Sequence, residues 1–555
     1  MADQRPWLAH YPEGIPANIN PDAYPTLVAM FEETFEKYRK LPAFTCMDAT
    51  LTFDQLDKQS QQFGGYLLSR GLEPGDRVAL MMPNLLQYPI ALFGALRAGL
   101  IVVNTNPLYT YREMKHQFND SGVKAIVIVE NFAAELQKIL PDTKIKAVVL
   151  TTIGELLGSV KGALTNFVVR KVKRMVPAYQ LENTVSFKEA LTQGKKYKMP
   201  PLQGGINDVI LHQYTGGTTG VAKGAMLTNR NLLANMAQIR ATMLPVLKER
   251  EEVAVSPLPM YHIFAFTVNC LALMSIGTHT VLVVNPRDLG SINKEIKKYK
   301  PTVMTGVNTL FNGLINNKEF QQLEHHLKVT SGGGMAVQRV VAEKWQQITG
   351  CALSEGYGMT ESSPVASSNP VVTGGKIGTI GMPIPSTDMR IVDDNGEPLG
   401  VDEIGEIQIK GPQVMKGYYN RPDETAKCIT PDGWLNTGDI GAMDAEGYFR
   451  IVDRKKDMIL VSGFNVYPNE VEDIIASHPK VLEVAAIGVP DEKSGEAVKV
   501  FVVKKDKSLT ESELKEWCKA EMTGYKKPRH VEFRKELPKS NVGKILRREL
   551  REPTS

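Results

Sequence analysis

A glycine-rich stretch combines the residue types that could bind a polyphosphate. It runs from Tyr214 to Gly224 and reads YTGGTTGVAKG. Glycines let backbone N–H groups approach an anion closely, hydroxyl side chains add hydrogen-bond donors, and Lys223 adds a mobile positive charge. The spacing differs from that of a P-loop, because Ala222 precedes the lysine and a glycine follows it. The stretch predicts a nucleoside triphosphate site of another kind, with a flexible glycine- and threonine-rich linker as the alternative.

Two further glycine turns accompany a candidate metal ligand. Residues 331–335 read SGGGM, and residues 356–361 read GYGMTE. Glycine turns at strand ends are typical of the crevice in which α/β sheets bind ligands. Glu361 could hold Mg²⁺, which usually takes one or two carboxylates together with phosphate oxygens. A solvent-exposed turn glutamate is the alternative.

Three other positions allow more than one interpretation. Asp439 ends the stretch DGWLNTGD, and its carboxylate could accept both hydroxyls of a ribose or simply stabilise a turn. His262 follows a Pro-Leu-Pro run and could be a packed, hydrogen-bonded core histidine. Lys544 lies in the basic segment 539–550, which on its own predicts a solvated basic helix.

The elements that would position these residues alternate in type along the chain. Short apolar runs such as Arg77–Met82 and Val123–Val129 alternate with helix-like segments between about residues 51 and 284. This alternation predicts parallel sheets covered by helices on both faces. From Gly374 the runs become shorter and are punctuated by glycines, which favours an antiparallel or barrel-like portion over about 374–452.

A run of five charged residues, Asp453–Asp457, predicts a domain boundary. Beyond it, strand-like runs over 484–489 and 498–503 and a Thr510-x-x-Glu513 capping pattern predict a small α+β domain. The expected organisation is a large domain over 1–452, a connection over 453–456 and a small domain over 457–555.

Composition fits a globular enzyme and argues against several other classes. The 555-residue chain is 43% hydrophobic and 23% charged, and its net charge of +4 argues against a dedicated nucleic-acid binder. Five cysteines without a C-x-x-C pair predict reduced thiols in a cytosolic protein. The sequence shows no signal peptide and no apolar run long enough to span a membrane, so we expect a cytoplasmic location.

One segment has the composition of a membrane-surface helix. Residues 167–176 read FVVRKVKRMV and alternate cations with aliphatic side chains. This pattern could dock on anionic lipid, although a solvent-facing helix or an internal positive face would look the same.

In this order, the motifs resemble those of the adenylate-forming ligases, which include acyl-CoA synthetases, luciferases and peptide-synthetase adenylation domains. The resemblance covers about residues 51–550. Residues 214–224 resemble the family's phosphate loop, and residues 357–361 resemble its adenine and Mg²⁺ motif. Residues 437–439 resemble its ribose motif, and residues 453–456 resemble its hinge. Residues 432–456 are similar to the fatty acyl-CoA synthetase signature, and 81–89, 306–311 and 461–469 also match that subgroup.

The resemblance implies both a fold and a reaction. The fold is α/β: a large N-terminal domain of two helix-flanked β-sheets plus a small distorted β-barrel, joined by a hinge to a small, mobile α+β domain. The reaction is ATP-dependent activation of a long-chain fatty acid to acyl-CoA through acyl-AMP, with release of pyrophosphate and AMP. The alternatives are activation of a medium-chain or aryl acid, phosphoryl transfer that yields ADP, and non-catalytic binding of an acyl group or nucleotide.

The resemblance also implies a role for each motif residue. Lys544 would be the catalytic lysine, Glu361 the Mg²⁺ ligand and Lys456 the hinge residue. Thr360 would assist at the α-phosphate, and His262 would lie near the acyl carboxylate. The implied ATP-binding residues are Tyr214, Thr215, Gly216, Gly217, Thr218, Thr219, Gly220, Lys223, Gly333, Gly334, Tyr357, Gly358, Asp439 and Arg454. The implied coenzyme A-binding residues are Val461, Ser462, Gly463 and Phe464.

The implied partners are ATP, Mg²⁺, coenzyme A and a long-chain fatty acid, with no nucleic acid. A long acyl chain needs an apolar channel, because each buried CH₂ contributes ~0.8 kcal/mol. Candidates to line it lie in Met260–Leu273 and Gly306–Ile315. The substrate partitions into lipid, which makes a peripheral contact with the inner face of the cytoplasmic membrane reasonable. The sequence leaves room for a homodimer as well.

Overall fold

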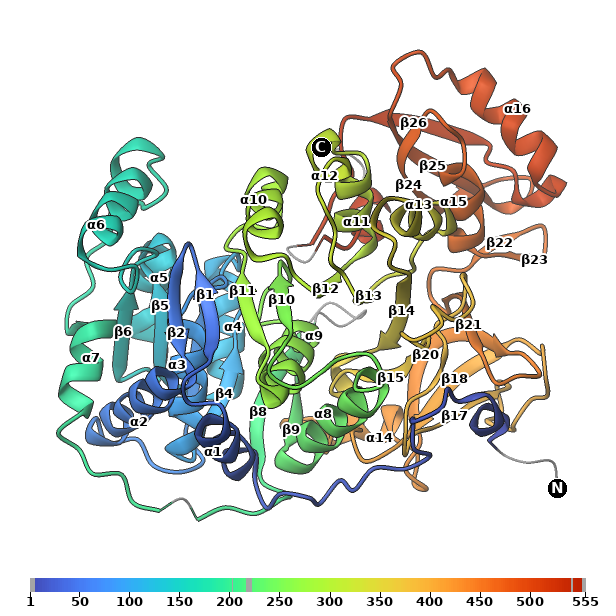
Figure 1. Cartoon of the computed structure of the whole chain (residues 1–555). Helices are drawn as coiled ribbons and strands as arrows, with labels where there is room; N and C mark the ends of the chain where they lie inside the picture. The colour runs from blue at the N-terminus through green and yellow to red at the C-terminus, as the bar shows by residue number, and fades with distance from the viewer. Residues whose placement is uncertain (1–4, 202, 216–221, 541–542, 552–555) are drawn as a thin grey trace.

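Two large mixed sheets form the body of the molecule (Figure 1). The structure, a computed structural model, describes residues 5–201, 203–215, 222–540 and 543–551. One sheet has the order β16 (Met382–Pro383), β15 (Val365–Ser368), β14 (Leu353–Gly358), β13 (Val329–Gly332), β12 (Val303–Gly306), β10 (Val253–Ser256), β11 (His279–Leu282), β1 (Pro42–Cys46), β2 (Ala49–Thr52). The other has the order β19 (Gly417–Tyr418), β9 (Lys223–Thr228), β8 (Val209–Thr215), β4 (Ile101–Asn104), β3 (Arg77–Met81), β5 (Val123–Val129), β6 (Ala147–Thr151), β7 (Thr184–Ser186).

Helices cover both faces of each sheet, as the alternating sequence pattern predicts. A buried apolar cluster between the sheets joins residues of both to the middle helices, which are α1 (Leu27–Lys37), α2 (Phe53–Ser69), α3 (Gln87–Arg97), α8 (Asn229–Met243) and the π-helix η5 (Phe266–Leu273). The outer helices are α10 (Leu289–Tyr299), α11 (Asn308–Ile315) and α13 (Arg339–Thr349) on one sheet, and α4 (Tyr111–Ser121) and α5 (Ala133–Ile139) on the other.

Strand β3 shows how the sequence dictates this layering. Val78 and Leu80 face the middle helices, whereas Ala79 and Met81 pack on the outer side with α4 and α5. Successive side chains of a strand point to opposite faces, so a strand buried on both sides reads as a continuous apolar run. Both sheet neighbours of β3, which are β4 and β5, run parallel to it.

Helix starts follow local capping chemistry. Thr228 accepts a hydrogen bond from the N–H of Asn231, and the Asn231 side chain accepts from Thr228 N–H, which together cap α8. In α16 (Glu511–Glu521), Thr510 accepts from the N–H of Glu513 as its sequence predicts. Glu513 pairs with Lys480 at 2.8 Å, so its side chain is engaged outside the predicted box.

The expected barrel-like portion folds as an antiparallel sheet packed beside the first large sheet. Its strands are β17 (Asp388–Val392), β18 (Gly405–Lys410), β20 (Leu435–Met443) and β21 (Phe449–Arg454), in that order. Its apolar face buries Ile391, Ile407 and Phe449 in one cluster with Trp7. The short helix α14 (Pro422–Cys428) precedes β20 in the chain.

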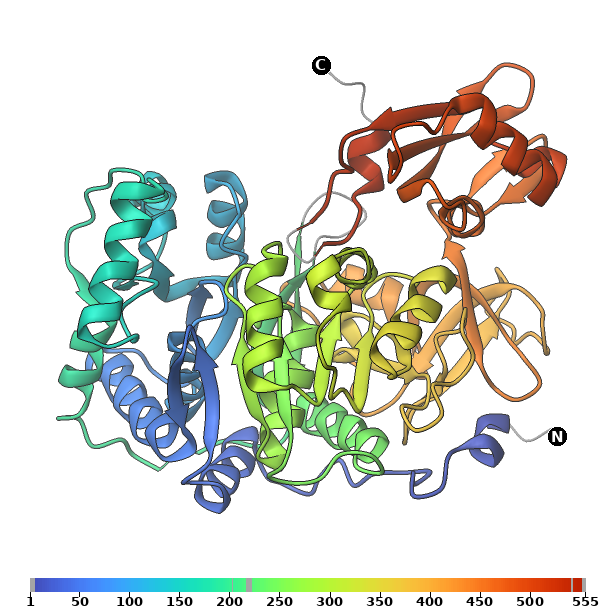
Figure 2. The same ribbon diagram turned by 45° about the horizontal axis from the view of Figure 1, so that its top comes forward.

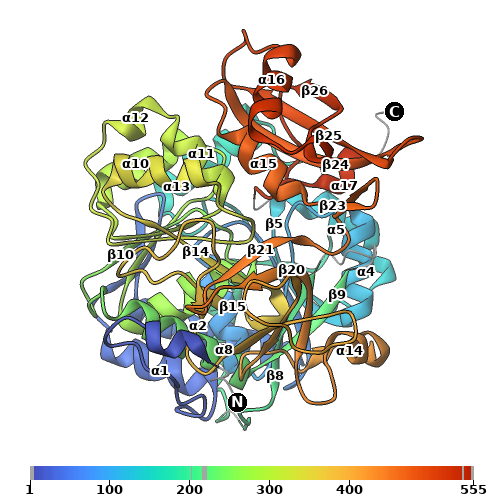
Figure 3. The same ribbon diagram turned by 90° about the vertical axis from the view of Figure 1, so that its right-hand side faces the viewer.

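The last part of the chain has a sheet and a core of its own (Figures 2 and 3). Its sheet has the order β23 (Phe464–Val466), β22 (Ile459–Val461), β25 (Gly495–Lys504), β24 (Val481–Asp491), with β26 (His530–Arg534) paired to β25. Helices α15 (Pro468–Ala476) and α16 complete it, and α17 (Arg547–Arg551) lies against β24. The remaining helices of the large part include α6 (Ser159–Phe167), α7 (Phe187–Gly194), α9 (Ile263–Ala265), α12 (Lys318–Gln321) and the short η7 (Thr360–Ser362).

Hydrogen bonds fix this C-terminal part on top of the large part. Thr309 Oγ1 donates to the carbonyl of Gly543 at 2.9 Å, and Asn312 Nδ2 donates to the carbonyl of Leu482 at 2.8 Å. Both donors lie on α11, so one helix carries both contacts. Among the described residues, no helix combines the length and apolar character needed to cross a bilayer.

Candidate active site

A cavity of about 2040 Å³ lies where the large sheets, the antiparallel sheet and the C-terminal part meet. The ends of β13 and β14 supply Gly333, Gly334, Tyr357 and Gly358 to its wall, and β20 and β21 supply Asp439 and Arg454. Substrate crevices of α/β sheets form in this way at the carboxyl ends of parallel strands. The sequence motifs therefore converge on one cavity, although they are spread over more than three hundred residues.

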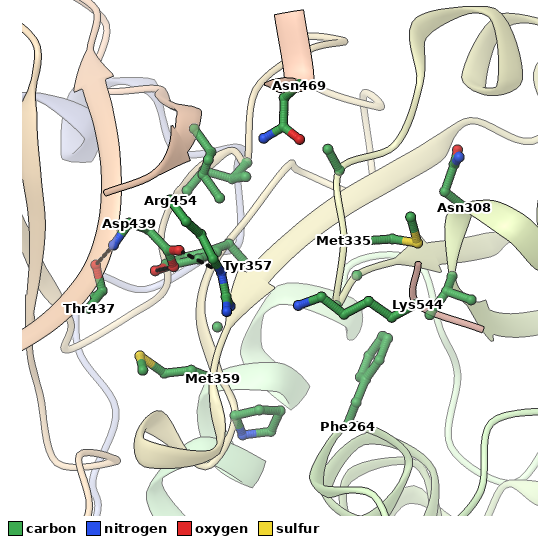
Figure 4. A pocket seen from close by; sticks show the side chains of 18 of the residues that line it. Phe264, Asn308, Met335, Tyr357, Met359, Thr437, Asp439, Arg454, Asn469 and Lys544 are labelled. Atoms are coloured by element: carbon green, nitrogen blue, oxygen red, sulfur yellow. Dashed lines mark hydrogen bonds and ion pairs between the residues drawn. The ribbon is translucent and has the colours of Figure 1, made fainter. Parts of the chain in front are cut away.

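Tyr357, Asp439 and Arg454 form a connected group on one side of the cavity (Figure 4). The Tyr357 hydroxyl donates to Asp439 Oδ2 at 2.7 Å, and Arg454 Nε lies 3.3 Å from Asp439 Oδ1. Asp439 is only 6% exposed, so its charge needs these partners. Burial, followed by the charge of Asp439, raises the pKa of Tyr357 well above its usual value, which keeps the phenol a hydrogen-bond donor.

The glycine at the end of β14 is required by its surroundings. A Cβ atom on Gly358 would lie 1.8 Å from the carbonyl oxygen of Pro364. That close approach turns the chain sharply into η7 and brings Thr360 and Glu361 to the cavity wall.

Glu361 is buried and bound by a residue that the sequence analysis did not select. Tyr418, on β19, donates its hydroxyl to Glu361 Oε1 at 2.6 Å. Burial raises the pKa of Glu361, and the Tyr418 hydrogen bond and the charge of Lys223 oppose that rise. Within the described ranges, no three or more His, Cys, Asp or Glu side chains gather into a metal-binding group. One carboxylate fits a Mg²⁺ ion whose other ligands are phosphate oxygens and water.

Lys223 is held beside the same tyrosine. Its Nζ lies 4.6 Å from the centre of the Tyr418 ring and 2.8 Å from Glu424 Oε2 on α14. Tyr214, at the other side of the loop, donates to Asp120 Oδ2 at 2.7 Å. Thr215 also lines the cavity, whereas the predicted loop residues Gly216, Gly217, Thr218, Thr219 and Gly220 lie outside the described residues.

Lys544 reaches into the cavity from the C-terminal part. Figure 4 shows its side chain extended above Phe264 toward the side where Arg454 and Tyr357 lie. Burial, followed by the charge of Arg454, lowers the pKa of Lys544 to about 8, and the charge of Asp439 opposes the shift. The Lys544 ammonium can therefore interact at short range with an anion bound in the cavity.

Arg547 anchors the segment that carries Lys544. Its guanidinium donates twice to Glu472, at 3.0 and 2.8 Å, and to Asn469 at 2.6 Å, both on α15. It also donates to Asp453 Oδ1 at 3.2 Å, on β21. Burial raises the pKa of Glu472 and of Asp453, and the positive charge of Arg547 opposes both rises. Arg547 thus ties the C-terminal segment to residues on both sides of Lys456, the predicted hinge residue.

His262 also lines the cavity and is neutral near pH 7. Burial, followed by the charge of Lys544, lowers its pKa to about 4. Its Nδ1 accepts from the N–H of Phe264 at 3.4 Å, which leaves Nε2 as the protonated nitrogen. The imidazole is therefore suited to donate a hydrogen bond and carries no positive charge.

Apolar side chains make up part of the cavity wall. They come in part from the predicted range Met260–Leu273, through Ile263 and Val268, and in part from α8, through Ile239 and Met243. The contribution of α8 has no signal in the sequence. From the other predicted range, Gly306–Ile315, the lining residues are Val307, Asn308, Thr309 and Asn312, which include the contacts to the C-terminal part.

The predicted coenzyme A residues lie elsewhere in this arrangement. Val461 ends β22, and Phe464 begins β23. The turn between these two strands consists of Ser462 and Gly463, whose φ angles are 51° and 85°. Phe464 is exposed and stacks on Tyr525 with ring centres 4.7 Å apart. None of these four hairpin residues is among the described residues that line the cavity.

Comparison with known proteins places this site in a family. A profile of AMP-binding enzymes matches residues 31–419, and one of the AMP-binding enzyme C-terminal domain matches residues 470–544. The chain belongs to the AMP-binding enzyme family. It is 56% identical to a long-chain-fatty-acid–CoA ligase of Escherichia coli O157:H7 over 98% of both chains. It is also 38% identical to the long-chain-fatty-acid–CoA ligase of Bacillus subtilis strain 168, over 100% of this chain and 98% of the relative.

A solved structure of a CoA ligase shares the fold. The crystal structure of an anthranilate CoA ligase in complex with anthranoyl-AMP matches with a TM-score of 0.84 at 23% identity, over 96% of this chain and 98% of that chain. The expected fold class, a large part with several sheets followed by a smaller C-terminal part, is therefore confirmed.

The contacts of three residues of this AMP-binding enzyme were not predicted from the sequence, because their partners are distant in the chain. Tyr418 bonds Glu361, Glu424 pairs with Lys223, and Arg547 bonds Asp453 and α15. Each lies near a predicted motif or in a basic segment, but nothing in the sequence shows which side chain it meets. A tyrosine after Gly417 and a glutamate after Pro422 are ordinary residues until the fold brings them to the cavity.

Proposed function

We propose that this enzyme activates long-chain fatty acids to acyl-CoA in two steps, through acyl-AMP. The observation that carries the proposal is one cavity lined by Lys544, by the Tyr357–Asp439–Arg454 group and by Glu361, with apolar side chains of α8 and η5 in the same wall. The names of the relatives that match the whole chain support the same substrate class. ATP and coenzyme A are the co-substrates of this reaction.

In the first step the fatty carboxylate attacks the α-phosphate of ATP, and pyrophosphate leaves. This step brings an anion against a polyanion, so electrostatic stabilisation dominates. Lys544 supplies a positive charge between the carboxylate and the α-phosphate, and Thr360 assists there. The neutral His262 donates a hydrogen bond near the acyl carboxylate. No described residue is assigned as a general base, because a carboxylate needs none.

The nucleotide is held by the groups on the other side of the cavity. Asp439 accepts the ribose hydroxyls, with Arg454 beside it, and the loop that ends at Lys223 holds the β- and γ-phosphates. To reach the phosphates, Lys223 exchanges its Glu424 partner, at 2.8 Å, for phosphate oxygens. Gly333, Gly334 and Gly358 allow the adenosine to approach the backbone.

Mg²⁺ fits this cavity through Glu361 and the phosphate oxygens of ATP. When bound, the ion spreads the negative charge of the phosphates. Tyr418 orients the Glu361 carboxylate by its 2.6 Å hydrogen bond, and both side chains are nearly inaccessible to water.

In the second step the thiol of coenzyme A attacks the acyl carbon, and AMP leaves. The hairpin of Val461, Ser462, Gly463 and Phe464 lies outside the cavity in this arrangement, so the small domain must turn before it can bind coenzyme A there. We assign that turn to Lys456, in the segment between β21 and β22, where a few residues can absorb a large φ/ψ change. The boundaries 1–452, 453–456 and 457–555 are part of this proposal.

The substrate places the enzyme beside a membrane. A fatty acid partitions into lipid, so we place the protein in the cytoplasm, in peripheral and reversible contact with the inner face of the cytoplasmic membrane. A homodimer is compatible with this arrangement but is not needed to complete the cavity.

ATP–pyrophosphate exchange across acids of rising chain length tests the proposal. We expect exchange to depend on Mg²⁺, to rise with chain length into the long-chain range and to occur without coenzyme A. A maximum rate of exchange with aryl or medium-chain acids would show that those acids, and not long-chain fatty acids, are the substrate class. Product ADP would instead indicate phosphoryl transfer, and absent exchange by folded protein would indicate a binding protein.

A further inference from the structure

An exposed apolar stripe runs along α6 and the π-helix η4 (Val168–Val172). Val160, Leu164, Phe167, Val172 and Met175 are each between 52% and 81% exposed. Large apolar side chains are rarely gathered at such exposure on a free surface, and their clustering marks an interaction site. Figure 1 shows α6 at the left edge of the molecule, far from the antiparallel sheet and the C-terminal part.

The π-helix keeps these residues on one face. Their spacing is 4, 3, 5 and 3 residues. Steps of three and four follow one face of an α-helix, and a π-turn widens the step by one residue. The five-residue step from Phe167 to Val172 coincides with η4, so the stripe continues through the irregular turn instead of rotating away.

The same segment is uniformly basic. Between Glu155 and Glu182 the chain has five cations, Lys161, Arg170, Lys171, Lys173 and Arg174, and no acidic residue. Lys161 pairs with Asp48 and Arg170 with Glu130. Lys171, Lys173 and Arg174 are exposed and form no ion pair within the part of the chain that the structure describes. Three cations therefore flank the apolar stripe with their charge available.

The inner face of the segment is hydrogen-bonded to residues that closely follow strands β5 and β6. Asn166 accepts from the N–H of Gly154 at 2.8 Å and donates to Thr152 at 2.9 Å, and Arg170 is bidentate on the buried Glu130. A Cβ on Gly162 would lie 2.3 Å from the carbonyl oxygen of Gly154, so the helix and the loop below it touch. These contacts hold the helical segment in its folded form, so the stripe does not need to fold on binding.

We infer that the outer face of 159–175 is the surface by which this enzyme docks on a bilayer containing anionic lipid. Apolar side chains with flanking Lys and Arg match the boundary between acyl chains and anionic headgroups, where such a helix lies in the plane of the surface. A protein partner would need an acidic apolar surface, and a second copy would bring like charges together. This inference rests on the proposed function for its biological sense, because the acid substrate is drawn from lipid, but its test needs no substrate.

Vesicle co-sedimentation with the full-length protein tests the inference. We expect binding to vesicles of phosphatidylcholine mixed with phosphatidylglycerol, little binding to phosphatidylcholine alone, and weakening as salt is raised. Replacing the three free cations (Lys171→Gln, Lys173→Gln, Arg174→Gln) should weaken binding to the anionic vesicles about a hundredfold. Leu164→Ser with Phe167→Ser should weaken binding to the anionic vesicles while leaving its salt dependence in place.

A matched control and a second assay separate this inference from the proposed function. Val372→Ser with Val401→Ser alters two comparably exposed apolar residues elsewhere and should bind vesicles like the unaltered protein. All variants should form acyl-CoA normally from detergent-solubilised fatty acid, so a loss of that activity points to the catalytic proposal. Equal binding by all variants, or no preference for anionic vesicles, overturns the inference. A dimer that dissociates on Leu164→Ser with Phe167→Ser assigns the stripe to a second copy instead.

Discussion

The charge state of Lys544 links the local environment of one side chain to the first chemical step. Burial and the charge of Arg454 lower its pKa to about 8, more than two units below the ordinary value of 10.5. In the proposed mechanism the ammonium is the form that stabilises the developing anion, so we expect activity to be retained below this pKa and lost as the pH rises through it. Bound ATP opposes the shift, so the effect belongs to the free enzyme and to kcat/KM.

We therefore expect kcat/KM for adenylation to fall about tenfold per pH unit above about pH 8. Lys544→Arg, whose guanidinium stays charged over this range, should be slower overall but should lack the alkaline fall. Pyrophosphate release measured between pH 6 and 10 checks both curves. A flat profile for the unaltered enzyme up to pH 10, or the same fall in the arginine variant, would show that another group titrates.

At the scale of single residues, the sequence predicts identities better than partners. Lys544, Glu361, Tyr357 and Asp439, to which the resemblance to adenylate-forming ligases gives roles, all line one cavity, and those roles stay predictions. Tyr418, 57 positions after Glu361, was not predicted to bond it. That pairing depends on β19 lying at the edge of the second large sheet beside β9, which no local pattern encodes.

At the scale of elements, α17 begins with Arg547, whose hydrogen bonds hold the segment that carries Lys544 in position. Arg547, three positions after the lysine, donates to Asp453, which precedes the hinge residue Lys456, and to Asn469 and Glu472, which follow it. A change of one ångström at a reacting group can cost about a hundredfold in rate. The bonds of Arg547 therefore belong to the adenylation step although its guanidinium reacts with nothing.

Arg547→Lys keeps the charge but loses the planar fork that serves several acceptors. We expect adenylation to fall between roughly tenfold and a hundredfold, while acyl-CoA formation from preformed acyl-AMP stays near normal. A thermal unfolding midpoint close to that of the unaltered protein would exclude a folding defect. Arg529→Lys changes an exposed ion pair with Asp491 in the same domain and serves as the control. Equal losses in both half-reactions would contradict a positioning role.

Local rules predict elements well where capping and periodicity agree. Thr510 caps α16, as its sequence predicts, and β3 has the two-faced burial expected of a parallel strand. The apolar part of the cavity wall shows the limit of these rules. Ile239 and Met243 belong to a helix whose buried residues look like ordinary core, and only the packing of α8 beside η5 turns that face toward the cavity.

At the scale of the whole molecule, this arrangement suits adenylation. Lys544 is in the cavity, the α11 contacts to Gly543 and Leu482 are made, and the hairpin 461–464 lies outside. The thioester step needs a different surrounding for the same acyl carbon, so a turn about Lys456 would have to break the bond from Arg547 to Asp453. The second arrangement could not be predicted from sequence, because both arrangements use the same residues and differ in which side chains meet.

The most direct measurement is a single-turnover reaction with enzyme in excess over ATP labelled in its α-phosphate, in the presence of palmitate and Mg²⁺ but without coenzyme A. The proposed function predicts that the label appears in palmitoyl-AMP, with pyrophosphate released in equal amount. Later addition of coenzyme A should then convert the adenylate to palmitoyl-CoA and AMP. Formation of ADP, or intact ATP after incubation with correctly folded enzyme, would contradict it.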